Sequence, residues 1–161
     1  MISLSRSLAF MGVLLVAGCQ STKPKDYQPT LARFYLESAD GRGMAVTLPR
    51  SEVRMSLNAQ PVLREADIVD VDLVQVELGK CLAFRLTGSA ARDCYRMSAS
   101  HQGRRLVLLI NGEALGARRI DAPIGDGMVL VFVEVPESAL PKLVADLKRT
   151  AVVLQRELAR K

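Results

Sequence analysis

Residues 104–120 read RRLVLLINGEALGARRI, with an apolar strand pattern on each side of the dipeptide Asn111-Gly112. Asn-Gly is the preferred pair for a two-residue type I′ turn, because both turn positions need a positive φ. The segment therefore predicts a β-hairpin with strands at 104–110 and 113–120. The rest of the fold has to accommodate this antiparallel pair.

Strand patterns with a period of two residues also occupy the first part of the chain. Residues 31–38 and 44–48 flank a turn at 40–43, which predicts a second hairpin. Residues 53–59 alternate apolar and polar side chains and predict a half-buried strand, which we expect to end at Pro61 because proline lacks the N–H that a ladder needs.

Three more strands are predicted in the middle and late parts of the chain. Residues 68–78 and 80–87 form two of them, joined at Gly79. The apolar alternation of the first changes phase at Leu73-Val74, which indicates a β-bulge. The near-continuous apolar run at 127–135 predicts a strand that is buried on both faces, or nearly so.

Two segments have a helical period instead. Residues 89–103 predict a short amphipathic helix, with Ser89 as its N-cap and Gly103 as its C-terminal stop. A longer helix begins at Ser138 and carries a stripe of apolar residues at helical spacing: Leu140, Leu143, Val144, Leu147, Ala151, Leu154 and Leu158. Many strands and two helices predict an α+β domain with one antiparallel or mixed sheet, covered by the short helix and the long C-terminal helix.

The N-terminus has the pattern of an export signal. Arg6 precedes an apolar segment at 8–16, which is shorter than the roughly 20 residues that a bilayer-spanning helix needs. Val16-Ala17-Gly18-Cys19 resembles the lipobox of bacterial lipoproteins. The resemblance implies that residues 1–18 are removed and that Cys19 is diacylated (palmitate-type chains) and becomes the membrane anchor. Two or three acyl chains bind a membrane firmly, whereas one binds only marginally.

The resemblance also implies a location. Gln20 follows Cys19 where many lipoproteins of the inner membrane carry an acidic residue, so we expect the periplasmic face of the outer membrane in a Gram-negative host. Residues 19–30 are polar and contain proline, which predicts a flexible tether. The domain is then expected at 31–161.

Charge and composition argue against nucleic acid as a partner. The full chain has a net charge of +5, but its basic residues are scattered among acids, and it has no Trp to offer as a stacking platform. Scattered charge is typical of a solvated face. Such a charge distribution would support only weak attraction to anionic lipid headgroups or cell-wall polymers.

Two cysteines remain in the predicted domain, Cys81 at the start of a strand and Cys94 in the following helix. Export would place them where a disulfide can persist. Either they form such a bridge, or they are two buried thiols that pack as small apolar side chains.

No pattern for enzyme chemistry or for a cofactor stands out in the sequence. It has no G-x-S-x-G elbow and no S-x-x-K pair. The single histidine, His101, ends an apolar helix stripe, which favours a structural role at a helix C-terminus. With one histidine and two cysteines, a zinc site is hard to assemble. We therefore expect a protein that is not an enzyme and that holds no metal or cofactor.

Residues 82–147 resemble the head subdomain of the first periplasmic domain of SecD, a preprotein translocase subunit. That family has a strand ending in threonine, a helix to a glycine, an apolar strand, an Asp/Asn-Gly turn, a proline-containing approach to a last strand, and a helix. The matching positions here are Thr87, Gly103, Asn111-Gly112, Ala122-Pro123-Ile124, Gly127 and the helix at Leu140–Leu147. The upstream strands, including ADIVDVDL at 66–73 with its Asp-Ile dipeptide at 67–68, resemble the opening segment of that head, so the resemblance covers about residues 31–148.

The SecD resemblance implies a rigid, non-enzymatic module that binds an exported client chain or another envelope protein. The predicted contact surfaces are the apolar strand edges or the leucine stripe of the C-terminal helix. The turns beyond Lys148 are the favoured contact if they extend past the sheet, and the sequence leaves open whether they dock or project. The alternative is a lipoprotein that binds cell-wall material or a small ligand through Arg104, Arg118 and Arg119, near the hairpin.

Overall fold

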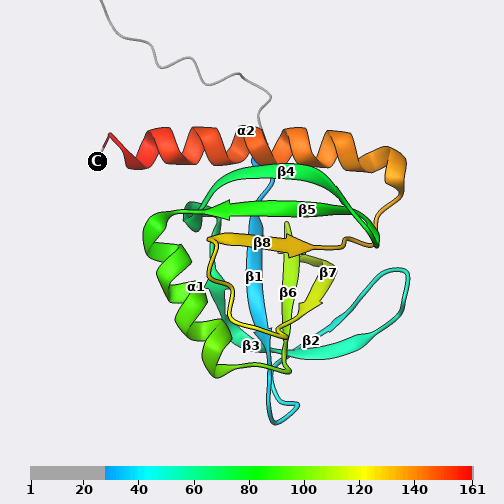
Figure 1. Ribbon diagram of the computed structural model, residues 1–161. Helices are drawn as coiled ribbons and strands as arrows, with labels where there is room; N and C mark the ends of the chain where they lie inside the picture. The colour runs from blue at the N-terminus through cyan, green and yellow to red at the C-terminus, as the bar shows by residue number, and fades with distance from the viewer. Residues whose placement is uncertain (1–27, 161) are drawn as a thin grey trace, which may run out of the picture.

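The computed structural model describes residues 28–160; the predicted signal peptide, Cys19 and most of the predicted tether lie outside these residues. The strands are β1 (Ala32–Glu37), β2 (Met44–Thr47), β3 (Arg54–Leu63), β4 (Ile68–Val76), β5 (Gly79–Leu86), β6 (Arg105–Ile110), β7 (Glu113–Arg119) and β8 (Met128–Val131). The helices are α1 (Gly88–Ser100) and α2 (Leu140–Leu158), and the short 3-10 helices η1 (Glu65–Asp67) and η2 (Glu137–Ala139) precede β4 and α2 (Figure 1).

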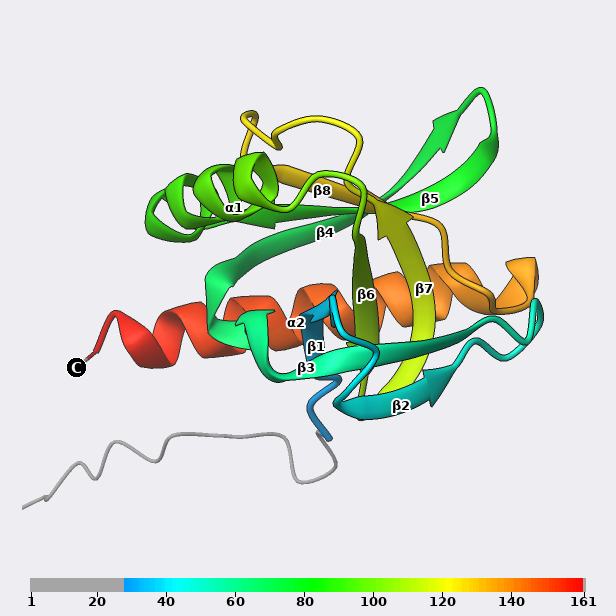
Figure 2. The same cartoon turned by 90° about the horizontal axis from the view of Figure 1, so that it is seen from below.

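The strands form two antiparallel sheets rather than the single sheet predicted from the sequence. One sheet has the order β2-β3-β1-β6-β7 and the other β4-β5-β8. Figure 2 shows them as two layers, with α2 running along one side. Past β8, an isolated bridge between Gly116 and Val133 joins the sheets at one edge. The α+β class and the long C-terminal helix are as predicted.

The main core lies between the two sheets. Phe34 of β1 and Phe84 of β5 are both fully buried and meet edge to face, with ring centroids 5.0 Å apart. Such an aromatic pair stabilises by about 0.5–1.5 kcal/mol beyond its burial. The buried side of α2 closes this core with Leu140, Val144, Leu147 and Ala151. The leucine stripe of α2 is therefore buried in the domain as far as Ala151, whereas Leu158 at its end is 46% exposed.

A second, smaller apolar cluster occupies the other face of the five-stranded sheet. Met55 and Leu57 of β3 contribute to it, together with Val107 and Leu109 of β6.

The turn between β2 and β3 is held by Glu134, whose carboxylate accepts hydrogen bonds from the backbone N–H groups of Arg50 (2.8 Å) and Ser51 (2.9 Å).

Two predictions for the first strands are wrong. β1 and β2 do not form a hairpin, because β3 lies between them and pairs with both. β3 is long enough to do so, since it continues through Pro61 instead of ending there. Pro61 is tolerated because the β1–β3 register shifts on both sides of Tyr35, its partner, so the regular ladder is already interrupted at this point.

The bulge expected at Leu73-Val74 is absent, because that part of β4 pairs with β5 in continuous register. The shift lies between Ile68 and Asp70 instead. β8 is also shorter than the predicted strand, and Leu130 in it is only half-buried. The expectation of burial on both faces is therefore wrong.

The Asn-Gly hairpin and the short helix agree with the sequence. Asn111 and Gly112 have φ values of 50° and 90°, as a type I′ turn requires, and they connect β6 to β7. α1 begins one residue before the predicted N-cap: the Thr87 hydroxyl, not Ser89, accepts the hydrogen bond from the Ala90 N–H. Gly103 follows the helix with φ 85°.

Candidate protein-binding surface

The outer face of the β4-β5-β8 sheet is the candidate functional surface. Val71, Phe84 and Val129 lie side by side on the three strands, and their side chains point into the core. Successive side chains of a strand point to opposite faces of the sheet. The neighbouring positions Asp72, Ala83 and Leu130, also side by side, point to the opposite face. Because the alternation persists along each strand, Val74 and its partner Cys81 share that outer face with them.

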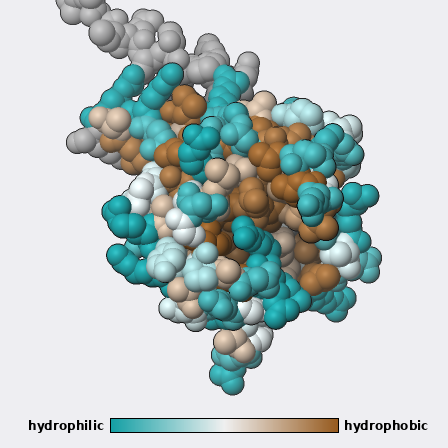
Figure 3. All heavy atoms as spheres, in the orientation of Figure 1, coloured by the Kyte–Doolittle hydropathy of each residue, from teal (hydrophilic) through white to brown (hydrophobic). Residues whose placement is uncertain are grey.

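No helix of the described chain crosses this outer face. α2 lies along β4 and α1 at one end of the strands, as Figures 1 and 2 show. Leu130 and Val74 are half-buried, and Phe132, the first residue after β8, is 40% exposed, whereas Cys81 and Ala83 of the middle strand are buried. Figure 3 shows hydrophobic side chains gathered in the middle of this face, over β5 and β8, with hydrophilic ones around them.

One end of the outer face is charged but balanced. Arg85 of β5 lies 3.9 Å from a carboxylate oxygen of Asp70 and of Asp72. Lys148 of α2 reaches over the edge of the sheet to the same two carboxylates, 2.5 Å from Asp72 and 3.8 Å from Asp70. The hydrogen bond to Asp72 and the nearby negative charge raise the pKa of Lys148. Two acids and two bases neutralise each other, so the apolar part dominates the character of the face.

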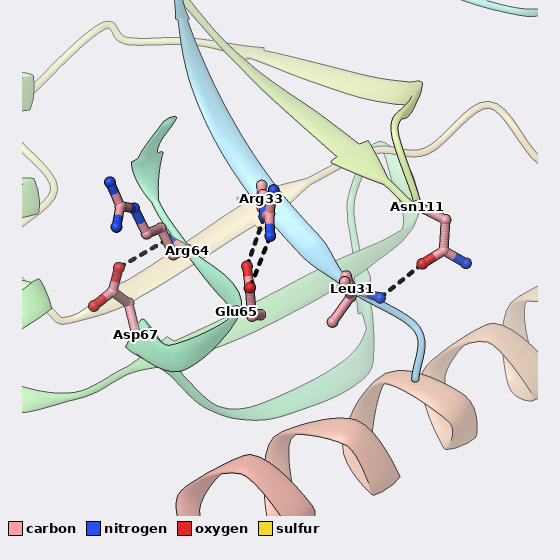
Figure 4. A network of polar contacts seen from close by, with 6 residues as sticks. All are labelled: Leu31, Arg33, Arg64, Glu65, Asp67 and Asn111. Carbon is pink, nitrogen blue, oxygen red and sulfur yellow. Dashed lines mark hydrogen bonds and ion pairs between the residues drawn. The ribbon is translucent and has the colours of Figure 1, made fainter. Parts of the chain in front are cut away.

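The start of the domain is held firmly against α2 and the β6–β7 turn. The Leu31 N–H donates to the Asn111 side-chain oxygen (2.8 Å), and the Asn111 N–H donates back to the Leu31 carbonyl (2.9 Å). One residue earlier, the Thr30 N–H donates to the Thr150 hydroxyl of α2 (2.9 Å). Figure 4 shows Leu31 and Asn111 meeting beside the helix. The point where the predicted tether joins the domain is therefore fixed.

The same region contains a bidentate ion pair. Arg33 donates to both carboxylate oxygens of Glu65 at 2.7 and 2.8 Å, and beside it the Asp67 carboxylate accepts the Arg64 N–H at the start of η1 (Figure 4). The hydrogen bond from Arg33 lowers the pKa of Glu65 against the opposing effect of burial. These contacts tie β1 to the connection between the two sheets.

The two cysteines of the domain are free thiols in the structure, so the disulfide considered from the sequence is not formed. The physical reason is their placement. Cys94 is part of the main core, whereas Cys81 alternates with the core residue Leu82 and therefore points to the other face of β5. Burial raises the pKa of Cys94 to about 11, so this thiol stays protonated.

The other residues singled out in the sequence have structural roles. His101 ends α1 and its Nδ1 lies 2.8 Å from the Met97 carbonyl oxygen. Arg104 is bound to the Glu37 carbonyl oxygen, and Arg119 pairs with Asp121 at 3.5 Å. Arg118 is half-buried. Arg104 and Arg119 therefore already have separate partners within the domain, which weakens the ligand-binding alternative.

Up to Gln155, the turns of α2 beyond Lys148 pack on the domain instead of projecting from it, so the condition for their predicted role as a contact surface is not met there. Thr150 and Ala151 are buried. The Gln155 amide donates to the carbonyl oxygens of Ala66 (2.9 Å) and Ile68 (3.1 Å), so the helix is docked at least that far.

Sequence reasoning missed the outer face of the three-stranded sheet because the apolar run at 127–135 was interpreted as a doubly buried strand. The sequence feature that could have indicated this face is the small size of Cys81 and Ala83 on the middle strand, compared with the larger residues beside them on the two neighbouring strands. Among residues 28–160 there is no group of three or more metal-ligating side chains, and no helix has the length and apolar character to cross a membrane.

These features define a two-sheet α+β domain with one open apolar sheet face. No protein-family model matches the chain, and no curated protein matches it significantly. Among solved structures, it is similar to SecDF in a super-membrane-facing form (TM-score 0.61, 17% identity), covering 76% of this chain and 19% of that one.

It is also similar to a structure of SecDF described as a membrane component that enhances protein export (TM-score 0.59, 15% identity, 76% of this chain and 63% of that one). A third is SecDF from Thermus thermophilus, described as translocon-associated (TM-score 0.52, 17% identity, 78% and 20%). The chain thus has the fold of a SecD-like domain and spans less than two thirds of the length of each of these proteins.

Proposed function

We propose that this chain is a non-enzymatic lipoprotein of the cell envelope, anchored through acylated Cys19 at the periplasmic face of the outer membrane. Its SecD-head-like domain binds an exported client chain or a protein partner through the outer face of β4, β5 and β8. The observation that carries this proposal is the apolar face, which no helix among residues 28–160 crosses. The likeness to a protein described as enhancing protein export supports it.

The composition of the face suits an unfolded segment better than a charged ligand. Leu130, Val74 and Phe132 offer partly exposed apolar surface, and burying such surface favours association by about 25 cal/mol per Å² before the costs of ordering. The charges at the other end are already paired. A client with apolar side chains and no special charge pattern fits this arrangement.

The proposal is tested with a photo-crosslinking amino acid at Leu130 and, as a control, at Glu113, which is exposed at the start of β7. A secretory protein that is kept unfolded by reduction and alkylation should crosslink at 130 and not at 113, and its folded form at neither position. Leu130→Asp should weaken binding of the unfolded protein about tenfold, because a carboxylate would have to be buried. The control Leu78→Asp, at a residue 86% exposed, should leave binding unchanged.

Equal crosslinking at both positions, or equal binding by both aspartate variants, would contradict the proposed surface. Lack of binding of unfolded protein, combined with crosslinks at 130 to one folded envelope protein, would identify a dedicated partner instead. Titration with peptidoglycan fragments and lipopolysaccharide tests the ligand-binding alternative, which flat responses at low salt would remove.

The anchor has a separate test. The intact mass of protein purified from its native host should lack residues 1–18 and carry at least two acyl chains on Cys19. An intact N-terminus or an unmodified cysteine would contradict the lipoprotein assignment.

A further inference from the structure

The outward side of α2 carries a row of basic residues. Lys142, Arg149 and Arg156 follow one another at intervals of seven residues, which places them within about 20° per step on the same side of a helix. Arg160 continues the row just past the end of the helix. All four are exposed, and the side chain of Lys142 is 82% accessible. The row therefore runs along the whole helix, about 28 Å at 1.5 Å per residue.

Two further exposed residues beside this row are small or apolar. Ala145 is exposed, and Val152 is 44% exposed although it is a large apolar residue on a surface helix. Of the two acids of α2, Asp146 lies about 40° round the helix from Lys142 and forms an ion pair with it (2.6 Å), and Glu157 lies on the same flank near the end of the helix. The four basic residues outnumber the two acids of the helix, so the outward side of α2 keeps a net positive charge, which anionic lipid headgroups attract.

The predicted tether meets the domain beside this row. Gln28 and Pro29 border a polar cavity of about 350 Å³ that Lys142 and Arg149 also line. The hydrogen bond from the Thr30 N–H to the Thr150 hydroxyl fixes the chain there. Cys19 lies only eleven residues before Thr30, so an anchor at Cys19 keeps α2 within about 36 Å of the bilayer at full extension.

We propose that the outward side of α2 docks on an anionic phospholipid bilayer, with the helix axis parallel to the membrane and the basic row facing the lipid phosphates. This inference rests on the proposed anchoring, because a short tether turns weak electrostatic attraction into a high local concentration of surface. Docking through α2 leaves the outer face of the three-stranded sheet free, since that face lies beside the helix and not behind it (Figure 1).

Thiol labelling of the full-length protein in vesicles tests the docking. A cysteine is introduced by Ala145→Cys on the basic side of α2 or, as the control, by Ala122→Cys in the exposed loop between β7 and β8. The buried Cys81 and Cys94 stay silent, and an acylated Cys19 has no free thiol. The maleimide reaction at position 145 should slow at least several-fold in vesicles with about one-third phosphatidylglycerol, compared with phosphatidylcholine alone, and the rate at position 122 should not change.

Charge removal provides the second arm. A basic residue near an anionic surface contributes about fivefold to binding, so Arg149→Gln/Arg156→Gln should lower the docked-to-undocked ratio about thirtyfold and abolish the protection. The matched control Arg54→Gln/Arg92→Gln removes the same net charge from exposed positions on β3 and α1 and should leave the protection intact. Circular dichroism verifies that both variants are folded.

The two proposals fail in different ways. Flotation with pure phosphatidylcholine vesicles reports the acyl anchor alone. If the protein does not float with them, the anchoring is contradicted, while the labelling experiment still reports on α2. Flotation without protection at position 145 would overturn the docking and leave the anchoring intact. Protection that appears only in native membranes would also overturn it, because a protein and not the bilayer would then cover α2.

Discussion

At Gly116 the five-stranded sheet closely approaches the segment after β8, and replacing this residue gives a quantitative test of the fold. The backbone of β7 bridges to Val133 there, and the Glu134 N–H donates to the Leu115 carbonyl oxygen at 2.7 Å. A Cβ atom at position 116 would overlap the carbonyl oxygen of Phe132 and lie 3.2 Å from Val131 Cγ2. The obstacle is largely backbone, so it cannot be relieved by a rotamer change.

Gly116→Ala should therefore separate β7 from the segment after β8. The loss of one hydrogen bond costs about 1 kcal/mol, and overpacking at a close contact costs about 1–3 kcal/mol. The expected decrease in the free energy of unfolding is about 2–4 kcal/mol, which lowers Tm by about 10 °C for a domain of this size. Thermal unfolding followed by circular dichroism measures this shift.

The matched control is Gly88→Ala. Gly88 begins α1 with a negative φ, and its added methyl group would meet only the end of the Arg92 side chain, 3.8 Å away. This variant should be as stable as the wild type or slightly more stable. If Gly116→Ala melts within about 2 °C of the wild type, the close approach of the two sheets at this edge is wrong.

Three further predictions follow from single contacts. Gln155→Ala should reduce the free energy of unfolding by about 1–3 kcal/mol, measured by urea denaturation, because the Ala66 and Ile68 carbonyls lose their donor; an unchanged midpoint would mean that the end of α2 is not docked. The lowered pKa of Glu65 means that its ion pair with Arg33 stabilises above the ordinary glutamate pKa, and this contribution disappears as the pH falls through the folded-state value. The stability difference between the wild type and Glu65→Gln should accordingly be present at neutral pH and vanish in acid, whereas a pH-independent difference would refute the pairing. Native protein should not react with maleimide at Cys94 until it is unfolded; failure to react even in denaturant without reductant would reveal a disulfide.

The local turn chemistry explains which parts of the fold were predictable. Asn111-Gly112 specifies a type I′ turn by itself, and the leucine spacing of α2 specifies its buried side, so both elements agree with the sequence. Strand neighbours are set by contacts between distant residues. Nothing near residues 31–48 indicates that β3 would pass between β1 and β2, because that order depends on pairs such as Phe34 with Leu63.

The candidate surface was the harder part for a related reason. A continuous apolar strand such as β8 has the same sequence pattern whether it is buried on both faces or exposes one of them to a partner. Only the position of α2 along β4, instead of across the sheet, decides between the two. The register that makes Ala83 the neighbour of Leu130 is likewise a product of the tertiary structure.

The placement of β1 also has a mechanical consequence. The chain enters the domain at Leu31 and runs directly into a strand that is flanked by β3 and β6. Tension on the tether therefore acts along the strand, across two ladders whose hydrogen bonds lie perpendicular to the pull, and loads them in shear together. A domain attached in this way resists forced extraction from its attachment side far better than one tethered through an edge strand, whose bonds would open one after another.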